Sequence, residues 1–122
     1  MPNKRSLCLA LLLLWFASAA WAEVTAYYRT AWTGNTVETV DGITTPGNGD
    51  FCIVNGTIDG IYKVCTVHRF NASSAANESG IENIDPDDET PGKWELHQPA
   101  YCFGTIEPSI TAGVVWFDTS AQ

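Results

Sequence analysis

The stretch Asp50–Val67 constrains the fold more than any other part of this chain. It contains two runs rich in apolar and β-branched residues, Phe51–Val54 and Ile61–Val67, which are joined by Asn55–Gly60. The linker holds Asn-Gly and Asp-Gly, two dipeptides that tolerate the positive φ angles of tight hairpin turns. The pattern predicts an antiparallel β-hairpin at the centre of an all-β fold.

Two cysteines lie on the predicted hairpin, Cys52 on its first run and Cys65 on its second. A turn centred on Ile58–Asp59 sets them directly opposite each other, and a turn centred on Asp59–Gly60 makes them diagonal neighbours. Side chains alternate with period two along a strand, so both registers place the two sulfur atoms on one face. Cys52 and Cys65 are therefore the favoured disulfide pair, with Cys102 free or an alternative partner.

The first 22 residues have the form of a secretory signal peptide. Lys4 and Arg5 precede an apolar run, Leu7–Ala20, and Ala20-Trp21-Ala22 is an A-x-A cleavage signature. The apolar run is shorter than the roughly 20 residues of a transmembrane span. Residues 1–22 are thus predicted to be removed, with retention as an N-terminal anchor as the alternative. The mature chain is expected to be secreted, periplasmic or extracellular, where disulfides persist.

Residues 23–122 are predicted to form one small domain. They carry 14 acidic side chains and four Lys or Arg side chains, which gives a formal charge of −10. A chain this acidic lacks the electrostatic footprint of proteins that bind nucleic acids or anionic lipids. Neither a nucleic acid nor, after signal cleavage, a membrane is expected as a partner.

Further strands are expected along the rest of the domain. Runs of alternating apolar residues predict strands at Glu23–Trp32, Lys93–His97, Tyr101–Phe103 and Val114–Phe117. Thr36–Thr45, with Asp41-Gly42 inside it, predicts a second short hairpin. No stretch sustains helical periodicity, so the expected architecture is a small antiparallel sheet or sandwich built from hairpins.

The segment Asn71–Gly92 has a different composition. It is rich in Asn, Ser, Asp, Glu and Pro, and its large apolar residues are Ile81 and Ile84. This composition predicts a long, acidic, exposed loop, with one turn of helix around Ala75–Glu78. Asp85–Glu89 is the densest acidic cluster, and it lacks the glycine and glutamate positions of a calcium-binding EF-hand loop, so it is interpreted as solvated.

The sequence predicts no catalytic residue, metal ligand or cofactor. Cys65-x-x-His68 is one short Cys–His pair, whereas structural zinc sites have two short pairs. His68 and His97 are the two histidines of the chain, and no Gly-x-Ser-x-Gly nucleophile elbow accompanies them. Both histidines are interpreted as residues on the surface of strands.

The aromatic residues are the stronger functional signal. Exposed aromatic side chains on a β-surface stack against sugar rings or anchor a protein partner. Trp94 and Trp116 occupy alternating apolar positions and are assigned to the core. The residues of the candidate binding surface are Tyr27, Tyr28, Trp32 and Tyr62.

Three stretches of the chain share an order of motifs with one known family. Val40–Val64 contains D-G-I, G-D-x-x-I-V and D-G-I-Y-x-V, Arg69–Leu96 is an acidic loop that ends in G-x-W-x-L, and Pro108–Ser120 contains G-x-x-W-F-D-T-S. In this order they resemble the small β modules of bacteriophage tail-fibre and related virion proteins. The resemblance implies a structural or receptor-contacting module without catalytic residues. The export signal and the cysteines depart from the family.

Together these features predict a secreted, non-enzymatic β module for binding or assembly. Edge strands of so small a sheet favour self-association or pairing with a protein partner, and an unpaired Cys102 could link two copies. A first alternative is a carbohydrate-binding module that uses exposed aromatic residues and binds a surface glycan, with Asn71–Gly92 as its specificity element. A second alternative is a small secreted enzyme, which requires a concave site with perturbed histidines or carboxylates.

Overall fold

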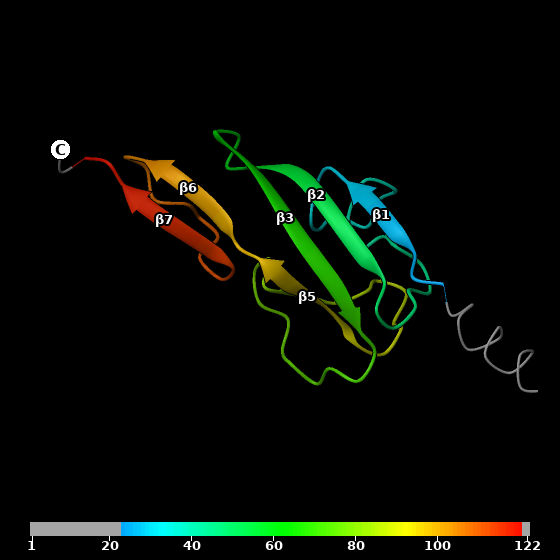
Figure 1. Cartoon of the computed structure of the whole chain (residues 1–122). Helices are drawn as coiled ribbons and strands as arrows, with labels where there is room; N and C mark the ends of the chain where they lie inside the picture. Colours follow the sequence, from blue (N-terminus) through cyan, green and yellow to red (C-terminus); the bar gives the residue numbers. More distant parts are fainter. Residues whose placement is uncertain (1–22, 121–122) are drawn as a thin grey trace, which may run out of the picture.

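A computed structural model describes residues 23–120, which form β-strands joined by turns and loops (Figure 1). The predicted signal peptide, residues 1–22, lies outside the described residues. Within the described range there is no helix, and accordingly none with the length and hydropathy of a membrane span. The prediction of a small all-β domain is confirmed.

The strands form one sheet of five and one sheet of two. The large sheet has the order β1-β2-β3-β5-β4, in which β1 runs parallel to β2 and the other neighbours are antiparallel. In the small sheet β6 runs parallel to β7. The bounds of the strands are β1 Ala26–Arg29, β2 Phe51–Ile58, β3 Tyr62–Asn71, β4 Asn83–Ile84, β5 Lys93–Gln98, β6 Ala100–Gly104 and β7 Val114–Asp118.

The hairpin β2–β3 is the centre of the large sheet, as predicted, but its turn has three residues. Ile58 pairs with Tyr62, and the loop between them has positive φ angles of 55° at Asp59 and 71° at Gly60. A three-residue loop shifts the register by one residue relative to a two-residue turn, and a shift of one residue moves side chains to the opposite face. The register therefore decides which side of the sheet each cysteine occupies.

The predicted Cys52–Cys65 disulfide is wrong for this register. Cys52 lies opposite His68 on the face that is buried, whereas Cys65 lies opposite Asn55 and is exposed. The two sulfur atoms thus point to opposite sides of the sheet, and Cys52, Cys65 and Cys102 are all free thiols. Cys102 is buried as well, so Cys65 is the accessible thiol of the three.

One face of the large sheet, here called the covered face, packs against the loops before β2 and before β5. Gly56 makes this packing close, since a Cβ there would lie 2.6 Å from Cη2 of Trp32. Trp32 also donates a hydrogen bond from Nε1 to Oγ1 of Thr66 at 2.8 Å. The buried hydrophobic residues are Trp32, Val40, Ile43, Cys52, Val54, Ile58, Val64, Phe70, Ile81, Ile84, Trp94, Ala100 and Cys102.

The predicted hairpin at Thr36–Thr45 is wrong, because this segment coils around its own side chains. The carboxylate of Asp41 accepts hydrogen bonds from the backbone N–H groups of Gly34 at 2.9 Å and Asn35 at 3.0 Å. The hydroxyl of Thr39 accepts one from the N–H of Thr36 at 3.0 Å. Short polar side chains that satisfy nearby backbone groups compete with strand pairing.

The segment Asn71–Gly92 is only partly the exposed loop that its composition predicts. Ile81 and Ile84 are buried in the core, and β4 pairs with β5. The predicted helical turn at Ala75–Glu78 is absent from the described structure. Burial of the two isoleucines outweighs the polar composition of their surroundings, so this segment closes the covered face.

His68 is buried on the covered face, and its interpretation as a surface residue is wrong. Its Nε2 lies 2.7 Å from the carbonyl oxygen of Ile81, while Nδ1 has no hydrogen-bond partner in the described structure. Burial lowers the pKa of His68 from its ordinary 6.5, and the contact with Ile81 opposes the shift only in part. The folded protein therefore holds His68 neutral at pH values where the unfolded chain binds a proton.

This difference predicts that the free energy of unfolding falls as the pH drops below about 6.5. In that range the unfolded state binds more protons than the folded state, so acid favours unfolding. Urea denaturation at pH 7.5 and pH 5.5 measures the change, and the His68→Gln variant is expected to show a smaller one. His97→Gln, at an exposed position, serves as the control. An equal pH dependence in wild type and His68→Gln contradicts the prediction.

The small sheet docks on the tip of the central hairpin. The carboxylate of Asp59 accepts hydrogen bonds from the backbone N–H of Ser109, at 2.7 Å, and from its hydroxyl. The hydroxyl of Tyr62 donates a hydrogen bond to the carbonyl oxygen of Ile106. The bonds from Ser109 lower the pKa of Asp59. The connection between β6 and β7 is thus tied to the turn between β2 and β3.

Candidate functional site

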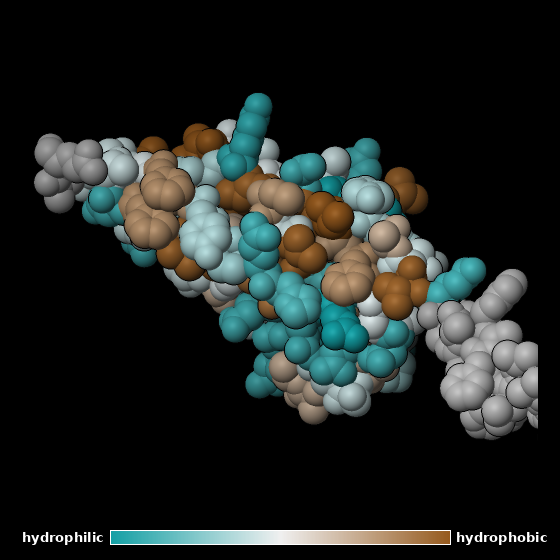
Figure 2. Space-filling view, in the orientation of Figure 1, coloured by the Kyte–Doolittle hydropathy of each residue, from teal (hydrophilic) through white to brown (hydrophobic). Residues whose placement is uncertain are grey.

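The opposite side of the large sheet, here called the open face, carries the candidate site. One row of neighbouring side chains crosses β1, β2 and β3 and consists of Tyr28, Ile53 and Val67. A second row crosses β2, β3 and β5 and consists of Phe51, Arg69 and Glu95. Figure 2 shows apolar side chains over β1 and β2 on this side of the molecule. The open face thus combines aromatic, aliphatic and charged groups, of which Tyr28 is largely exposed.

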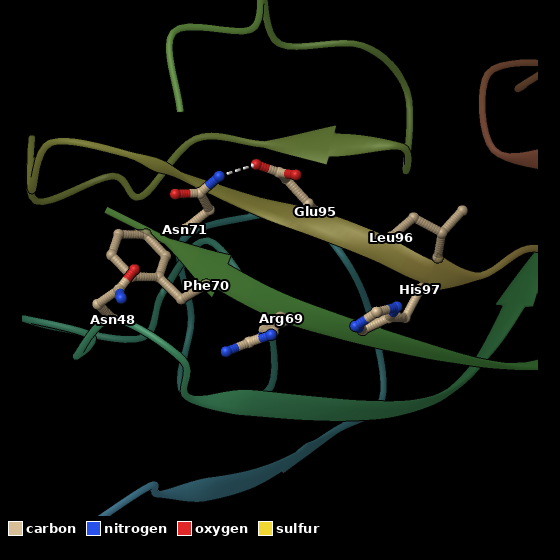
Figure 3. Close-up of a pocket in the computed structure, with 7 residues that line it drawn as sticks. All are labelled: Asn48, Arg69, Phe70, Asn71, Glu95, Leu96 and His97. Atoms are coloured by element: carbon tan, nitrogen blue, oxygen red, sulfur yellow. Dashed lines mark hydrogen bonds between the residues drawn. The ribbon is translucent and has the colours of Figure 1, made fainter. Parts of the chain in front are cut away.

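A cavity of about 350 Å³ lies at one end of the open face. Figure 3 shows a hydrogen-bonded pair, Asn71 and Glu95, on one side of the cavity, with Arg69 and His97 on the other. The residues that line it are Asn48, Arg69, Phe70, Asn71, Glu95, Leu96 and His97.

Phe51 orients the two side chains that dominate this cavity. The guanidinium carbon of Arg69 lies 5.9 Å from the centroid of the Phe51 ring, within the range of a cation–π contact. The His97 ring stacks on Phe51 with centroids 6.4 Å apart and planes inclined by 20°. His97 is exposed, as the sequence predicts. The cluster therefore presents a flat ring beside a positive charge.

The remaining polar groups of the cavity are partly used within the protein. Nδ2 of Asn71 donates to Oε1 of Glu95 at 2.6 Å, and Oδ1 of Asn48 accepts from the N–H of Ala72 at 3.0 Å. Within residues 23–120, the amide nitrogen of Asn48 and Oε2 of Glu95 form no further hydrogen bond, and the Arg69 guanidinium forms neither a hydrogen bond nor an ion pair. The cavity thus offers donors, one acceptor and one cation to a ligand.

The aromatic residues assigned from sequence to a binding surface do not form one. Trp32 is buried, Tyr27 packs edge-on against Trp94 with ring centroids 6.1 Å apart, and the hydroxyl of Tyr62 is bound to the backbone. Tyr28 alone of the four is largely exposed, at 71%. Sequence reasoning missed Phe51 and His97, since only strand pairing shows that they share a face.

A second exposed aromatic group covers the outer face of the small sheet. Phe103 stacks on Phe117 with ring centroids 4.7 Å apart, and Tyr101 stacks on Phe117 at 6.5 Å. Figure 2 shows apolar side chains over β6 and β7. On the inner face Trp116 packs against the core, as predicted. The alternation of inward and outward side chains within β6 and within β7 could be predicted from the sequence. The parallel pairing of the two strands could not.

The thiols and histidines do not assemble a reactive or metal-binding centre. Burial raises the pKa of the Cys52 thiol to about 11, against a smaller opposing effect of Arg29, and burial also raises the pKa of Cys102. Cys65 and His68 point to opposite faces of β3. Among the described residues no group of three His, Cys, Asp or Glu side chains is placed to hold a metal ion.

These features define a small β-sheet protein with a surface site on an uncovered sheet face. Comparisons of the chain with protein-family models, curated proteins and solved structures give no match. The resemblance to phage tail-fibre modules therefore stays a prediction from sequence motifs.

Proposed function

We propose that this protein is a secreted, non-enzymatic β module that binds a saccharide on its open face. The observation that carries the proposal is the cluster of Phe51, Arg69 and His97, which places a flat exposed ring beside a cavity with unused hydrogen-bonding groups. Sugar rings bind proteins by laying an apolar face on an aromatic ring while their hydroxyls form hydrogen bonds.

Binding is a better interpretation of this cavity than catalysis. General acid–base chemistry needs a titratable group that is free to exchange a proton with a reacting atom, in a site that excludes water. Here the His97 ring stacks against Phe51 at an exposed position, so it does not lie in a site that excludes water. This arrangement suits a contact surface better than a proton-transfer group. A receptor-contacting role is also what the tail-fibre-like motifs imply.

The proposal predicts that His97→Ala weakens glycan binding. Loss of a stacking ring is expected to reduce affinity by about three- to tenfold, which corresponds to the typical free energy of an aromatic pair. A glycan array identifies ligands of the wild-type chain, and titration of His97→Ala measures the loss. Phe103→Ala, which removes an exposed ring from the other sheet, is the matched control. Absence of any glycan binding by folded protein contradicts the proposal.

Assembly through the small sheet is a second candidate function. Two-stranded sheets are marginal alone, and parallel sheets normally have both faces covered, whereas the face with Phe103 and Phe117 is exposed. Light scattering after size exclusion, with and without reductant, tests association of the wild type against Phe103→Ser. A wild type that stays monomeric at every concentration rejects this function.

A further inference from the structure

The inference concerns the chemical class of the ligand, and it rests on the proposed function. Arg69 is exposed, is held over Phe51, and within residues 23–120 has no carboxylate within ion-pair distance. By contrast Lys93 pairs with Asp85 at 3.1 Å. In a chain with 14 carboxylates, an oriented arginine beside a cavity is available to an external anion.

The polar groups around Arg69 favour an anionic ligand that also carries hydroxyl groups. Oε2 of Glu95 can accept a hydrogen bond from a hydroxyl group of the ligand. Arginine binds a carboxylate through two parallel N–H···O bonds, a geometry that a point charge such as lysine cannot reproduce. His97 supplies the flat surface for a ring.

We propose that the open face binds a sugar that bears a carboxylate. The carboxylate pairs with Arg69, the sugar ring lies on His97, and a ring hydroxyl contacts Glu95. The carboxylate-bearing sugar is the same group in a free glycan and in a glycan attached to a surface. The proposed site therefore recognises one acidic sugar unit in either setting.

The overall charge limits how acidic the glycan is. Residues 23–122 carry a formal charge of −10, which repels a dense polyanion at long range. Contact between Arg69 and a single carboxylate acts over a few ångströms and is less affected by that distant charge. The ligand is therefore a mainly neutral glycan with isolated carboxylates, and not a highly sulfated chain.

Titrations of the full chain with small glycosides test the inference. The probes are methyl β-glucuronide, methyl α-sialoside, the neutral methyl β-glucoside and acetate, with Kd measured from NMR shift changes. At least one acidic sugar is expected to bind about tenfold tighter than the glucoside and than acetate, and the better of the two identifies the source of the carboxylate. Arg69→Ala is expected to bring acidic and neutral sugars within about twofold of each other.

Lys63→Ala is the matched control, because Lys63 is an exposed cation on the same strand, away from the cavity. It is expected to keep the acidic preference, and an equal loss in Lys63→Ala and Arg69→Ala overturns the inference. Equal binding of glucuronide and glucoside also overturns the inference, but the proposed function stands if His97→Ala weakens the binding of both.

If acetate binds as tightly as glucuronide, the inference is overturned and the cavity is a simple anion site. Failure of all probes overturns it, and the glycan array then decides whether the proposed function fails too.

Discussion

Replacing Trp94 by alanine is expected to lower the free energy of unfolding by about 3–5 kcal/mol. Trp94 is fully buried where the covered face meets the loops, with its ring centroid 5.3 Å from that of Phe70 and 6.1 Å from that of Tyr27. Alanine removes these contacts and leaves a cavity that the surrounding strands fill only partly. Urea denaturation followed by circular dichroism measures the loss.

Trp94→Phe separates packing from polarity at the same position. The indole Nε1 is buried without a hydrogen-bond partner in the described structure, so phenylalanine removes an unsatisfied donor while it keeps much of the aromatic volume. Trp94→Phe should therefore cost clearly less than Trp94→Ala. Val37→Ala, at a position that is 84% exposed, should change stability by no more than about 0.5 kcal/mol. A Trp94→Ala variant as stable as Val37→Ala would show that the core is placed elsewhere.

Gly42→Ala is expected to destabilise the protein by about 3 kcal/mol, at the upper end of overpacking costs. A Cβ at this position would lie 2.0 Å from the carbonyl oxygen of Thr36, and this neighbour is backbone. The carbonyl oxygen of Thr36 accepts hydrogen bonds from the N–H of Thr39 at 3.2 Å and from its hydroxyl at 3.0 Å, so it cannot move away without breaking them. Thermal and urea unfolding of the variant measure the effect.

Gly60→Ala is the comparison that isolates this steric conflict. Gly60 has a φ of 71°, and a Cβ added there would have no atom within 4 Å. Alanine at this position therefore costs only the left-handed backbone conformation, about 1–2 kcal/mol. The expected order of stability is wild type, Gly60→Ala, Gly42→Ala. If Gly42→Ala is the more stable of the two variants, the coiled conformation of Thr36–Gly42 is not the one that the protein adopts.

Strand positions were readable from the sequence because they depend on local patterns. Alternation of apolar residues and the turn dipeptides placed β2, β3, β5, β6 and β7 within a few residues of their observed bounds. The sequence likewise assigned Trp94 and Trp116 to the interior. Each of these inferences uses residues that lie next to one another along the chain.

The candidate site depended on register and pairing, which the local pattern leaves open. One additional residue in the turn at Asp59–Ile61 moved Cys65 away from Cys52 and to the opposite face of the sheet. The pairing of β2 with β3 and of β3 with β5 brought Phe51, Arg69 and Glu95 together. None of these three side chains stood out in the sequence as functional.

The amino-acid sequence by itself determined that this chain is all-β, acidic and centred on the hairpin at Asp50–Val67. The tertiary structure alone decided that Ile81 and Ile84 close the covered face, that His68 is buried, and that Phe51 and His97 share the open face. The physical reason is the range of the interactions. Backbone preference and alternation act over neighbouring residues, whereas burial and contact join residues far apart in the chain, which meet only when the strands pair.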